Sequence, residues 1–358
     1  MSLTAARPNA NTVNAIDLDA DGVACHSSSG PADPLVGQAS PRRIFVRGQL
    51  RCRLRLQHAG ERELRIRYEA QGVDDAPWLI VQGGISAHRH VASCEQAGEA
   101  GWWEVQCGEG RAIDTRCFRV LAIDWLGSDG TLDVPLDCAD QADAIATVLD
   151  ALDIDHVQAY VGCSYGASVG LHFAVRHPRR LKQLVAIAGA HRPDIWALAQ
   201  RKIQRGIVEL GRSEQARVEA LSLARQLAML GYRTRGELAA RFPQLPRQGD
   251  GGICHDSADW LDHVGAQYAA RTPVTAWLRL SESLDLHCVD PHDVTTPTTV
   301  IAINQDQLVP PALVDELVNA LPLPCRLHRI SSLFGHDAFL KETTAIDTLL
   351  RSELGVAA

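Results

Sequence analysis

The chain has 358 residues, of which 46% are hydrophobic, and a formal net charge of −8 at pH 7. This size allows one large core, or one core with a cap, and shows no sign of two equal domains. The acidic balance argues against a nucleic-acid partner, because phosphate binding needs a concentrated basic face. No run approaches about 18 uninterrupted apolar residues and no secretory signal opens the chain. We therefore expect a cytoplasmic protein that does not contact the membrane.

Residues 1–41 are rich in Ala, Asp, Ser, Pro and Gly without periodicity, which predicts a disordered or loosely attached leader. Asp17, Asp19 and Asp21 begin like a calcium loop, but Ser28 stands where a bidentate glutamate is needed. The 10 cysteines are scattered and form no C-x-x-C pair. We expect no metal site and predict reduced thiols rather than disulfides.

The next segments predict a sheet. Residues 43–54 and 63–68 alternate apolar with charged side chains, as half-exposed antiparallel strands at a sheet edge do. Short apolar runs follow, separated by helical or Gly-rich segments, and such runs are typical of parallel strands covered on both faces. These runs are residues 78–81, 118–123, 157–161, 184–187 and 299–303. The pattern predicts an α/β fold with a mostly parallel central sheet.

A long insert interrupts this pattern and predicts a second unit. Residues 191–293 are dominated by helix-period segments, such as 195–210 and 213–230. We predict a helical cap over the carboxyl ends of the strands, where open α/β sheets bind ligands. The core is then formed by residues 42–190 and 294–358.

Three short segments point to acyl transfer. The sequence Gly162-Cys163-Ser164-Tyr165-Gly166 is a G-x-S-x-G turn between an apolar strand and a helix, which exposes the serine. Asp306 follows the strand that ends at Ile303, and His336 follows the last predicted strand. The order Ser, Asp, His is that of α/β-hydrolase-fold enzymes. Each residue alone has an ordinary structural explanation, as a turn serine, a strand-end aspartate and one of 14 histidines, but their joint placement favours a catalytic triad.

An acyl-transfer site also needs backbone N–H donors for the oxyanion. Tyr165, directly after the serine, is the first predicted donor, and the Gly-rich loop after the strand at 78–81 offers the second, at Ile85 or Gly84. An ordinary βα turn is the alternative interpretation of that loop. His88 and His90 lie just beyond it without a third ligand, so we predict loop or surface histidines rather than a metal site.

In the insert, Arg201, Gln204 and Arg205 share one helical face and Lys202 is adjacent. A solvated helix surface explains most such arginines, so the pattern alone favours that interpretation over a functional one.

Together these segments resemble the homoserine O-acyltransferase family, whose α/β-hydrolase-fold members acylate an amino-acid hydroxyl from acyl-coenzyme A for methionine or cysteine synthesis. The resemblance runs from about residue 43 onward. Its motifs are Gly-Trp-Trp-Glu at 101–104, the Gly-rich segment at 108–115, Asp-x-Leu-x-Pro at 306–310 and Gly-His-Asp-Ala-Phe-Leu at 335–340.

The resemblance implies a role for each motif residue. Ser164 would accept the acyl group, His336 would act as general base and acid, and Asp306 would orient the histidine. Asp337 would receive the ammonium of the acceptor, and Arg233, in a stretch similar to the family's T-Y-R-S, would hold its carboxylate.

The substrates implied are an acyl-CoA donor and an amino-acid acceptor, with no cofactor besides acyl-CoA as co-substrate. Arg201 aligns with the position where succinyl-using members carry arginine, which favours succinyl-CoA over acetyl-CoA. L-Homoserine is the expected acceptor, but the loop 82–86 departs from the family pattern, so L-serine stays open. An esterase or thioesterase on the same fold is the other alternative. The resemblance also implies a homodimer, and we expect Lys202 and Arg205 to meet the coenzyme A phosphates.

Overall fold

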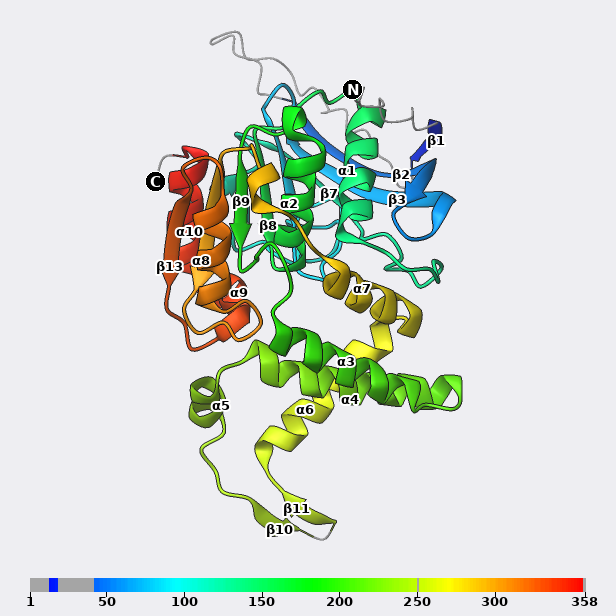
Figure 1. The fold of residues 1–358 in the computed structure, drawn as a ribbon, viewed down its shortest axis with the longest axis vertical. Coiled ribbons are helices and arrows are strands. Elements are labelled where there is room, and N and C mark those ends of the chain that lie inside the picture. Colours follow the sequence, from blue (N-terminus) through cyan, green and yellow to red (C-terminus); the bar gives the residue numbers. More distant parts are fainter. Residues whose placement is uncertain (1–12, 19–41, 250, 357–358) are drawn as a thin grey trace, which may run out of the picture.

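A computed structural model describes residues 13–18, 42–249 and 251–356. Nine strands of these residues form one sheet in the order β1-β2-β3-β7-β4-β8-β9-β12-β13 (Figure 1). The strands from β1 to β7 along this order pair antiparallel, and those from β7 to β13 pair parallel. Their bounds are β1 (Val13–Leu18), β2 (Arg43–Leu56), β3 (Gly60–Val73), β4 (Trp78–Gln82), β7 (Arg119–Ile123), β8 (Ala159–Cys163), β9 (Leu184–Ile187), β12 (Thr298–Ile303) and β13 (Arg326–Ile330).

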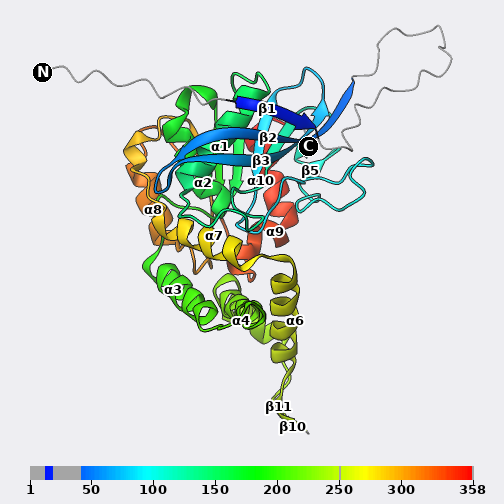
Figure 2. The ribbon, with the colours of Figure 1, turned by 90° about the vertical axis from the view of Figure 1, so that its right-hand side faces the viewer.

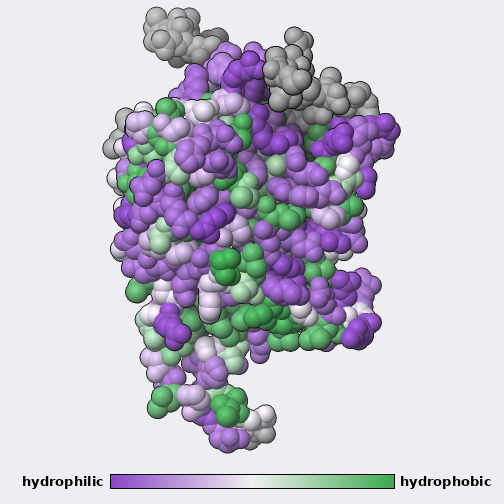
Figure 3. Space-filling view, in the orientation of Figure 1, coloured by the Kyte–Doolittle hydropathy of each residue, from purple (hydrophilic) through white to green (hydrophobic). Residues whose placement is uncertain are grey.

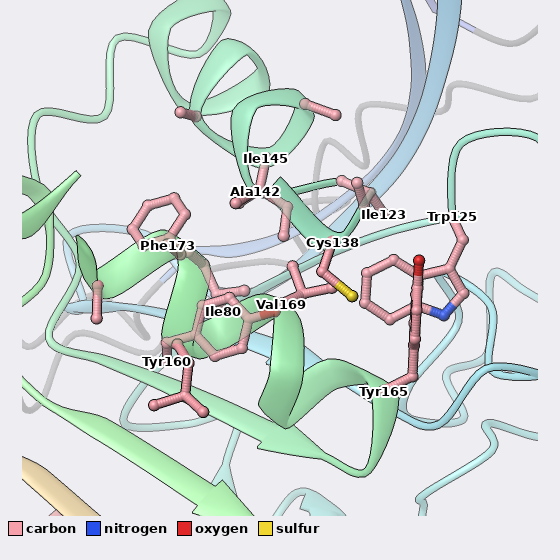
Figure 4. Packing of buried hydrophobic residues seen from close by; sticks show 14 of the residues in the cluster. Ile80, Ile123, Trp125, Cys138, Ala142, Ile145, Tyr160, Tyr165, Val169 and Phe173 are labelled. Carbon is pink, nitrogen blue, oxygen red and sulfur yellow. The ribbon is translucent and has the colours of Figure 1, made fainter. Parts of the chain in front are cut away.

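Burial explains the two strand patterns. Every residue of β8, β9 and β12 is buried, because helices cover both faces of the parallel part of the sheet. One face packs against α1 (Cys138–Ala151), α2 (Tyr165–Arg176) and α8 (Pro311–Ala320). The opposite face packs against α10 (Thr343–Leu354) and the segment 91–118, which includes the short strands β5 (Cys107–Gly108) and β6 (Ile113–Asp114). The first of these cores, between the sheet and α1 and α2, is shown in Figure 4.

The cap lies beyond the carboxyl ends of the parallel strands (Figures 1 and 2). Its helices α3, α4 and α6 pack around a small apolar core of their own, which α7 completes. A hairpin projects from the cap away from the rest of the molecule. The cap elements are α3 (Ile195–Glu209), α4 (Glu214–Tyr232), α5 (Arg235–Arg241), β10 (Arg247–Gly249), β11 (Gly252–Cys254), α6 (Asp256–Arg271) and α7 (Val274–Leu286).

The predicted α/β architecture is confirmed, and each predicted strand occurs. Several short strands were not predicted, among them β5 and β6, the hairpin β10–β11 and β1. The hairpin β10–β11 has strands of three residues each, too short for an alternating pattern. Val13–Leu18, inside the predicted leader, form β1, which pairs with the otherwise free edge of β2. The rest of the calcium-like pattern, from Asp19 to Ser28, lies outside the described residues.

Among the described helices, none combines the length and the apolar character that crossing a bilayer requires.

Candidate active site

Ser164 lies on a sharp turn between β8 and α2, with φ 53° and ψ −114°. A residue with a Cβ adopts this region only when its surroundings force it there. Two flanking glycines make the turn possible. A Cβ at Gly162 would lie 2.3 Å from the carbonyl oxygen of Gly166, and a Cβ at Gly166 would lie 2.2 Å from that of Gln82. The small residues of the G-x-S-x-G motif are therefore required by close backbone packing.

The structure brings Ser164, His336 and Asp306 into one hydrogen-bonded relay. Ser164 Oγ lies 2.7 Å from His336 Nε2, and His336 Nδ1 lies 2.6 Å from Asp306 Oδ2. The other carboxylate oxygen of Asp306 accepts hydrogen bonds from the backbone N–H groups of Leu308 at 2.8 Å and Val309 at 2.9 Å. Because β8, β12 and β13 are parallel, the segments that follow them meet at one edge of the sheet.

The electrostatics of His336 suit proton transfer. Burial by itself lowers the pKa of this imidazole, but the charge of Asp306 and its hydrogen bond outweigh burial and raise the pKa above its ordinary value. The nearby carboxylate of Asp337 acts in the same direction. Asp306 thus holds the ring and stabilises its protonated form.

The His336 ring is also held from its sides. Tyr232, the last residue of α4, stacks on it with 5.8 Å between ring centroids, and Phe339 meets it edge-on at 6.2 Å. Phe339 is fixed in turn, since its carbonyl accepts a hydrogen bond from Trp103 Nε1 at 3.1 Å. Trp103 belongs to the Gly-Trp-Trp motif, so that motif supports the histidine loop. Sequence reasoning did not assign Tyr232 to the site, because stacking between distant residues leaves no local pattern.

The predicted oxyanion donors surround Ser164. Tyr165 is the first residue of α2, so its N–H has no partner within the helix. Its side chain points into the core, where it meets Trp125 edge-on at 4.8 Å (Figure 4). A Cβ at Gly84 would lie 3.9 Å from Ser164 Cβ, and Ile85 lines the same pocket as Ser164. The loop after β4 therefore lies beside the serine.

A pocket opens above the relay, and the cap forms much of its wall. Ser164, His336 and Arg201 all line it. Arg201 Nε donates a hydrogen bond to Asp285 at 2.5 Å, whereas its buried Nη2 has no hydrogen-bond partner. An unpartnered guanidinium nitrogen in a pocket is a site for an anionic ligand group.

Arg205, which we expected to meet coenzyme A phosphates, is paired within the cap. Its guanidinium donates to the same Asp285 and, at 3.0 Å, to Ser281 Oγ. The second expected phosphate ligand, Lys202, is exposed.

Arg233 and Asp337 form an ion pair, with 3.1 Å between Nη2 and Oδ2. The pair lies next to His336 and Tyr232 in sequence, but neither residue is among those that line the pocket. Arg233 is buried, and its Nε has no hydrogen-bond partner. The two charges therefore compensate each other, and one guanidinium nitrogen is left without a hydrogen-bond partner.

His90 lies in a loop, as one of the two predicted placements has it, but it is not at the surface. It is 1% exposed, with Nδ1 2.7 Å from Glu69 Oε1 and Nε2 3.0 Å from the carbonyl of Glu99. Burial lowers its pKa, but the hydrogen bond and charge of Glu69 outweigh burial, and the pKa is raised. His90 therefore ties strand β3 to the segment after β4. In the part of the chain that the structure describes, no three His, Cys, Asp or Glu residues gather as a metal site would need.

Comparisons with known proteins agree with this geometry. A family profile described as the alpha/beta hydrolase fold matches residues 77–343. A homoserine O-succinyltransferase of Xanthomonas campestris pv. campestris is 52% identical over 309 residues, covering 86% of this chain and 84% of that protein. A homoserine O-acetyltransferase of Thermus thermophilus is 29% identical, over 80% of this chain and 85% of its own. The solved structure of a homoserine O-acetyltransferase from Bacillus anthracis shares the fold, with a TM-score of 0.77 at 15% identity over 87% of this chain and 98% of that one.

Proposed function

The chain belongs to the homoserine O-acyltransferase family of α/β-hydrolase-fold enzymes, and we propose that it transfers a succinyl group from succinyl-CoA to the hydroxyl of L-homoserine. The observation that carries this proposal is the hydrogen-bonded relay of Ser164, His336 and Asp306 inside a pocket that also presents an unpartnered nitrogen of Arg201. We further propose that this transfer is a step of methionine biosynthesis. We place the enzyme in the cytoplasm.

The reaction proceeds in two half-reactions. Ser164 Oγ attacks the thioester carbonyl while His336 Nε2 takes its proton, and the N–H groups of Tyr165 and of Gly84 or Ile85 receive the oxyanion. The C–S bond breaks, and the coenzyme A sulfur leaves with the proton from His336. L-Homoserine then enters, His336 removes its hydroxyl proton, and the resulting oxygen attacks the succinyl ester. The Cγ-bound oxygen gains the acyl group, Ser164 Oγ recovers a proton, and no cofactor beyond the co-substrate takes part.

The cap serves this sequence by excluding water. Water competes with the acceptor for the acyl-enzyme, so a transferase needs a covered site and an acceptor held in line. Helices α3, α4, α6 and α7 all contribute walls of the pocket, and His336 is only 4% exposed.

Arg233 and Asp337 are the proposed acceptor site. An amino acid carries one carboxylate and one ammonium, and the unpartnered Nε of Arg233 and the carboxylate of Asp337 offer one group for each. L-Serine carries the same two charges and differs by one methylene, so it stays the alternative acceptor.

Coenzyme A release with and without an acceptor tests the proposed function. We expect purified protein to release coenzyme A from succinyl-CoA repeatedly only when L-homoserine is present, and to form O-succinylhomoserine in equal amount. Thiol release and product are both measurable in one reaction. Release at the same rate without any amino acid would instead identify a thioesterase, and a preference for L-serine would change the acceptor.

Arg201→Ala should lower kcat/KM for succinyl-CoA by about 10- to 100-fold, because a charged hydrogen bond to the donor carboxylate is lost. The loss with acetyl-CoA should be much smaller. Asp285 keeps Arg205 as a partner in this variant, so we expect the cap to stay folded. Lys202→Ala, at the neighbouring exposed cation on α3, is the control: a contact with coenzyme A phosphates is common to both donors, so any loss should be equal with succinyl-CoA and acetyl-CoA. Equal losses with the two donors would remove Arg201 from donor selection.

We also propose a homodimer formed through the cap. The cap carries large apolar side chains that are strongly exposed, including Ile195 at 71%, Leu210 at 70% and Ile253 at 76%. Apolar surface is visible over the cap helices and the hairpin in Figure 3. Exposed apolar surface of this kind is typical of a protein interface. The mass of the protein in solution shows whether it is a dimer.

A further inference from the structure

A second arginine of the cap faces the candidate active site. Arg225, Ala228 and Tyr232 are spaced i, i+3 and i+7 on α4, and this face of the helix lines the pocket that contains Ser164 and His336. The guanidinium carbon of Arg225 lies 5.0 Å from the ring centroid of Tyr232 and 4.6 Å from that of Tyr268, on α6. Two cation–π contacts therefore fix the position of this guanidinium.

The positive charge of Arg225 is held but not neutralised. An aromatic ring attracts a cation through its quadrupole and carries no opposite charge. Among the residues that the structure describes, no carboxylate lies within ion-pair distance of Arg225, and Asp285 is already shared by Arg201 and Arg205. Of the other charged lining residues, Arg192 pairs with Glu316, and Asp194 accepts from the first N–H groups of α3. The pocket thus keeps a surplus of positive charge.

Both rings that hold Arg225 adjoin the relay. Tyr232 stacks on His336 at 5.8 Å, and the Tyr268 hydroxyl lies 3.3 Å from Ser86 Oγ, in the loop that contains Gly84 and Ile85. The Arg225 guanidinium carbon lies 5.0 Å from the Tyr232 ring centroid, which lies 5.8 Å from the His336 ring centroid. The distance from the guanidinium carbon to the His336 ring centroid therefore cannot exceed the sum of these two distances. Ser164, Arg201 and Arg225 all line the same pocket, so an anionic group on a short acyl chain at Ser164 shares that pocket with both arginines.

We propose that Arg225 binds the free carboxylate of a dicarboxylic acyl donor such as succinyl-CoA, together with the unpartnered Nη2 of Arg201, and so determines donor specificity. This inference rests on the proposed function. Three carbon–carbon bonds of about 1.5 Å separate the two carboxyl carbons of a succinyl group. A donor without the carboxylate leaves Arg225 without an anion and Arg201 Nη2 without a hydrogen-bond partner in a partly desolvated pocket, which disfavours acetyl-CoA.

Arg225→Met tests the proposal because methionine keeps an unbranched side chain beside the two tyrosines and removes the guanidinium with its charge and N–H donors. Acylation of Ser164 is followed in single turnover without acceptor, with succinyl-CoA and with acetyl-CoA. We expect the rate constant at subsaturating donor to fall by about 10- to 100-fold with succinyl-CoA and far less with acetyl-CoA. Arg225→Lys should recover part of the loss, because lysine restores the charge without the planar stacking.

Arg217→Met is the matched control. Arg217 lies two turns earlier on the same helix and lines a separate groove at the other end of the cap. Arg217→Met should leave the acylation rate constants with both donors unchanged. Thermal unfolding checks that each variant is folded. If Arg225→Met does not fold, the comparison of the two donors is made with Arg225→Lys.

Three results would overturn the inference. Equal losses with the two donors would show that Arg225 contacts a part common to both, such as a coenzyme A phosphate, or only supports Tyr232. A raised KM for L-homoserine with unchanged acylation would assign Arg225 to the acceptor carboxylate. Wild-type protein that neither donor acylates would contradict the proposed function itself, and this inference with it, whereas normal wild-type acylation with an unaffected variant contradicts the inference alone.

Discussion

Ser164→Ala should reduce acyl transfer by about 10⁴-fold or more while the protein stays folded. The substitution removes only the hydroxyl group, whose oxygen forms the covalent intermediate in the proposed mechanism. Intact-protein mass spectrometry after mixing with succinyl-CoA checks this directly. Wild-type protein should gain one succinyl group at Ser164, and the variant should gain none.

The control for this variant is Ser168→Ala. Ser168 lies one turn further along α2 and lines the same pocket, but it is not the hydroxyl that bonds to His336. Ser168→Ala should still be acylated at Ser164. A Ser164→Ala protein that retains turnover, or that is acylated as readily as wild type, would remove this residue from the mechanism.

Asp306→Asn should lower kcat by about 10⁴-fold. An amide oxygen can still accept from the N–H groups of Leu308 and Val309, so the local fold should persist. The amide cannot stabilise a charged imidazole, however, and it allows the wrong tautomer of His336. Steady-state kinetics with succinyl-CoA and L-homoserine measure the loss.

The same variant should change the pH dependence. Asp306 raises the pKa of His336, so its neutralisation lowers that pKa. His336 must be unprotonated to act as base, and therefore the acid limb of the pH–rate profile should move to lower pH. Asp315→Asn, which changes an exposed aspartate paired with Arg329, should leave both kcat and the profile as they are. An Asp306→Asn enzyme within tenfold of wild type would contradict the role of Asp306.

Much of the fold could be predicted from the sequence because its signals are local. The buried runs of β8, β9 and β12 are continuous and apolar, as strands covered on both faces must be. The turn at Ser164 depends on glycines two positions away on either side, so one pentapeptide specifies it. The parallel topology then carries Ser164, Asp306 and His336 to the same sheet edge.

The ion pairs of the site could not be predicted from local sequence patterns. Arg201 and Arg205 share a helical face in the sequence, but Asp285, 80 or more residues further along, decides which nitrogen stays unpartnered. Arg233 and Asp337 were predicted to bind the two charges of one acceptor, and the structure in addition pairs them directly with each other.

The sequence by itself therefore determined the strands, the serine turn and the family, since hydrophobic period and glycine sterics act between near neighbours in the chain. Only the tertiary structure decided that Tyr232 stacks on His336, that His90 is buried against Glu69, and that Arg225 lies against two tyrosine rings. Burial and ion pairing depend on which distant segments the fold brings into contact, and these contacts fix the charge that a ligand meets.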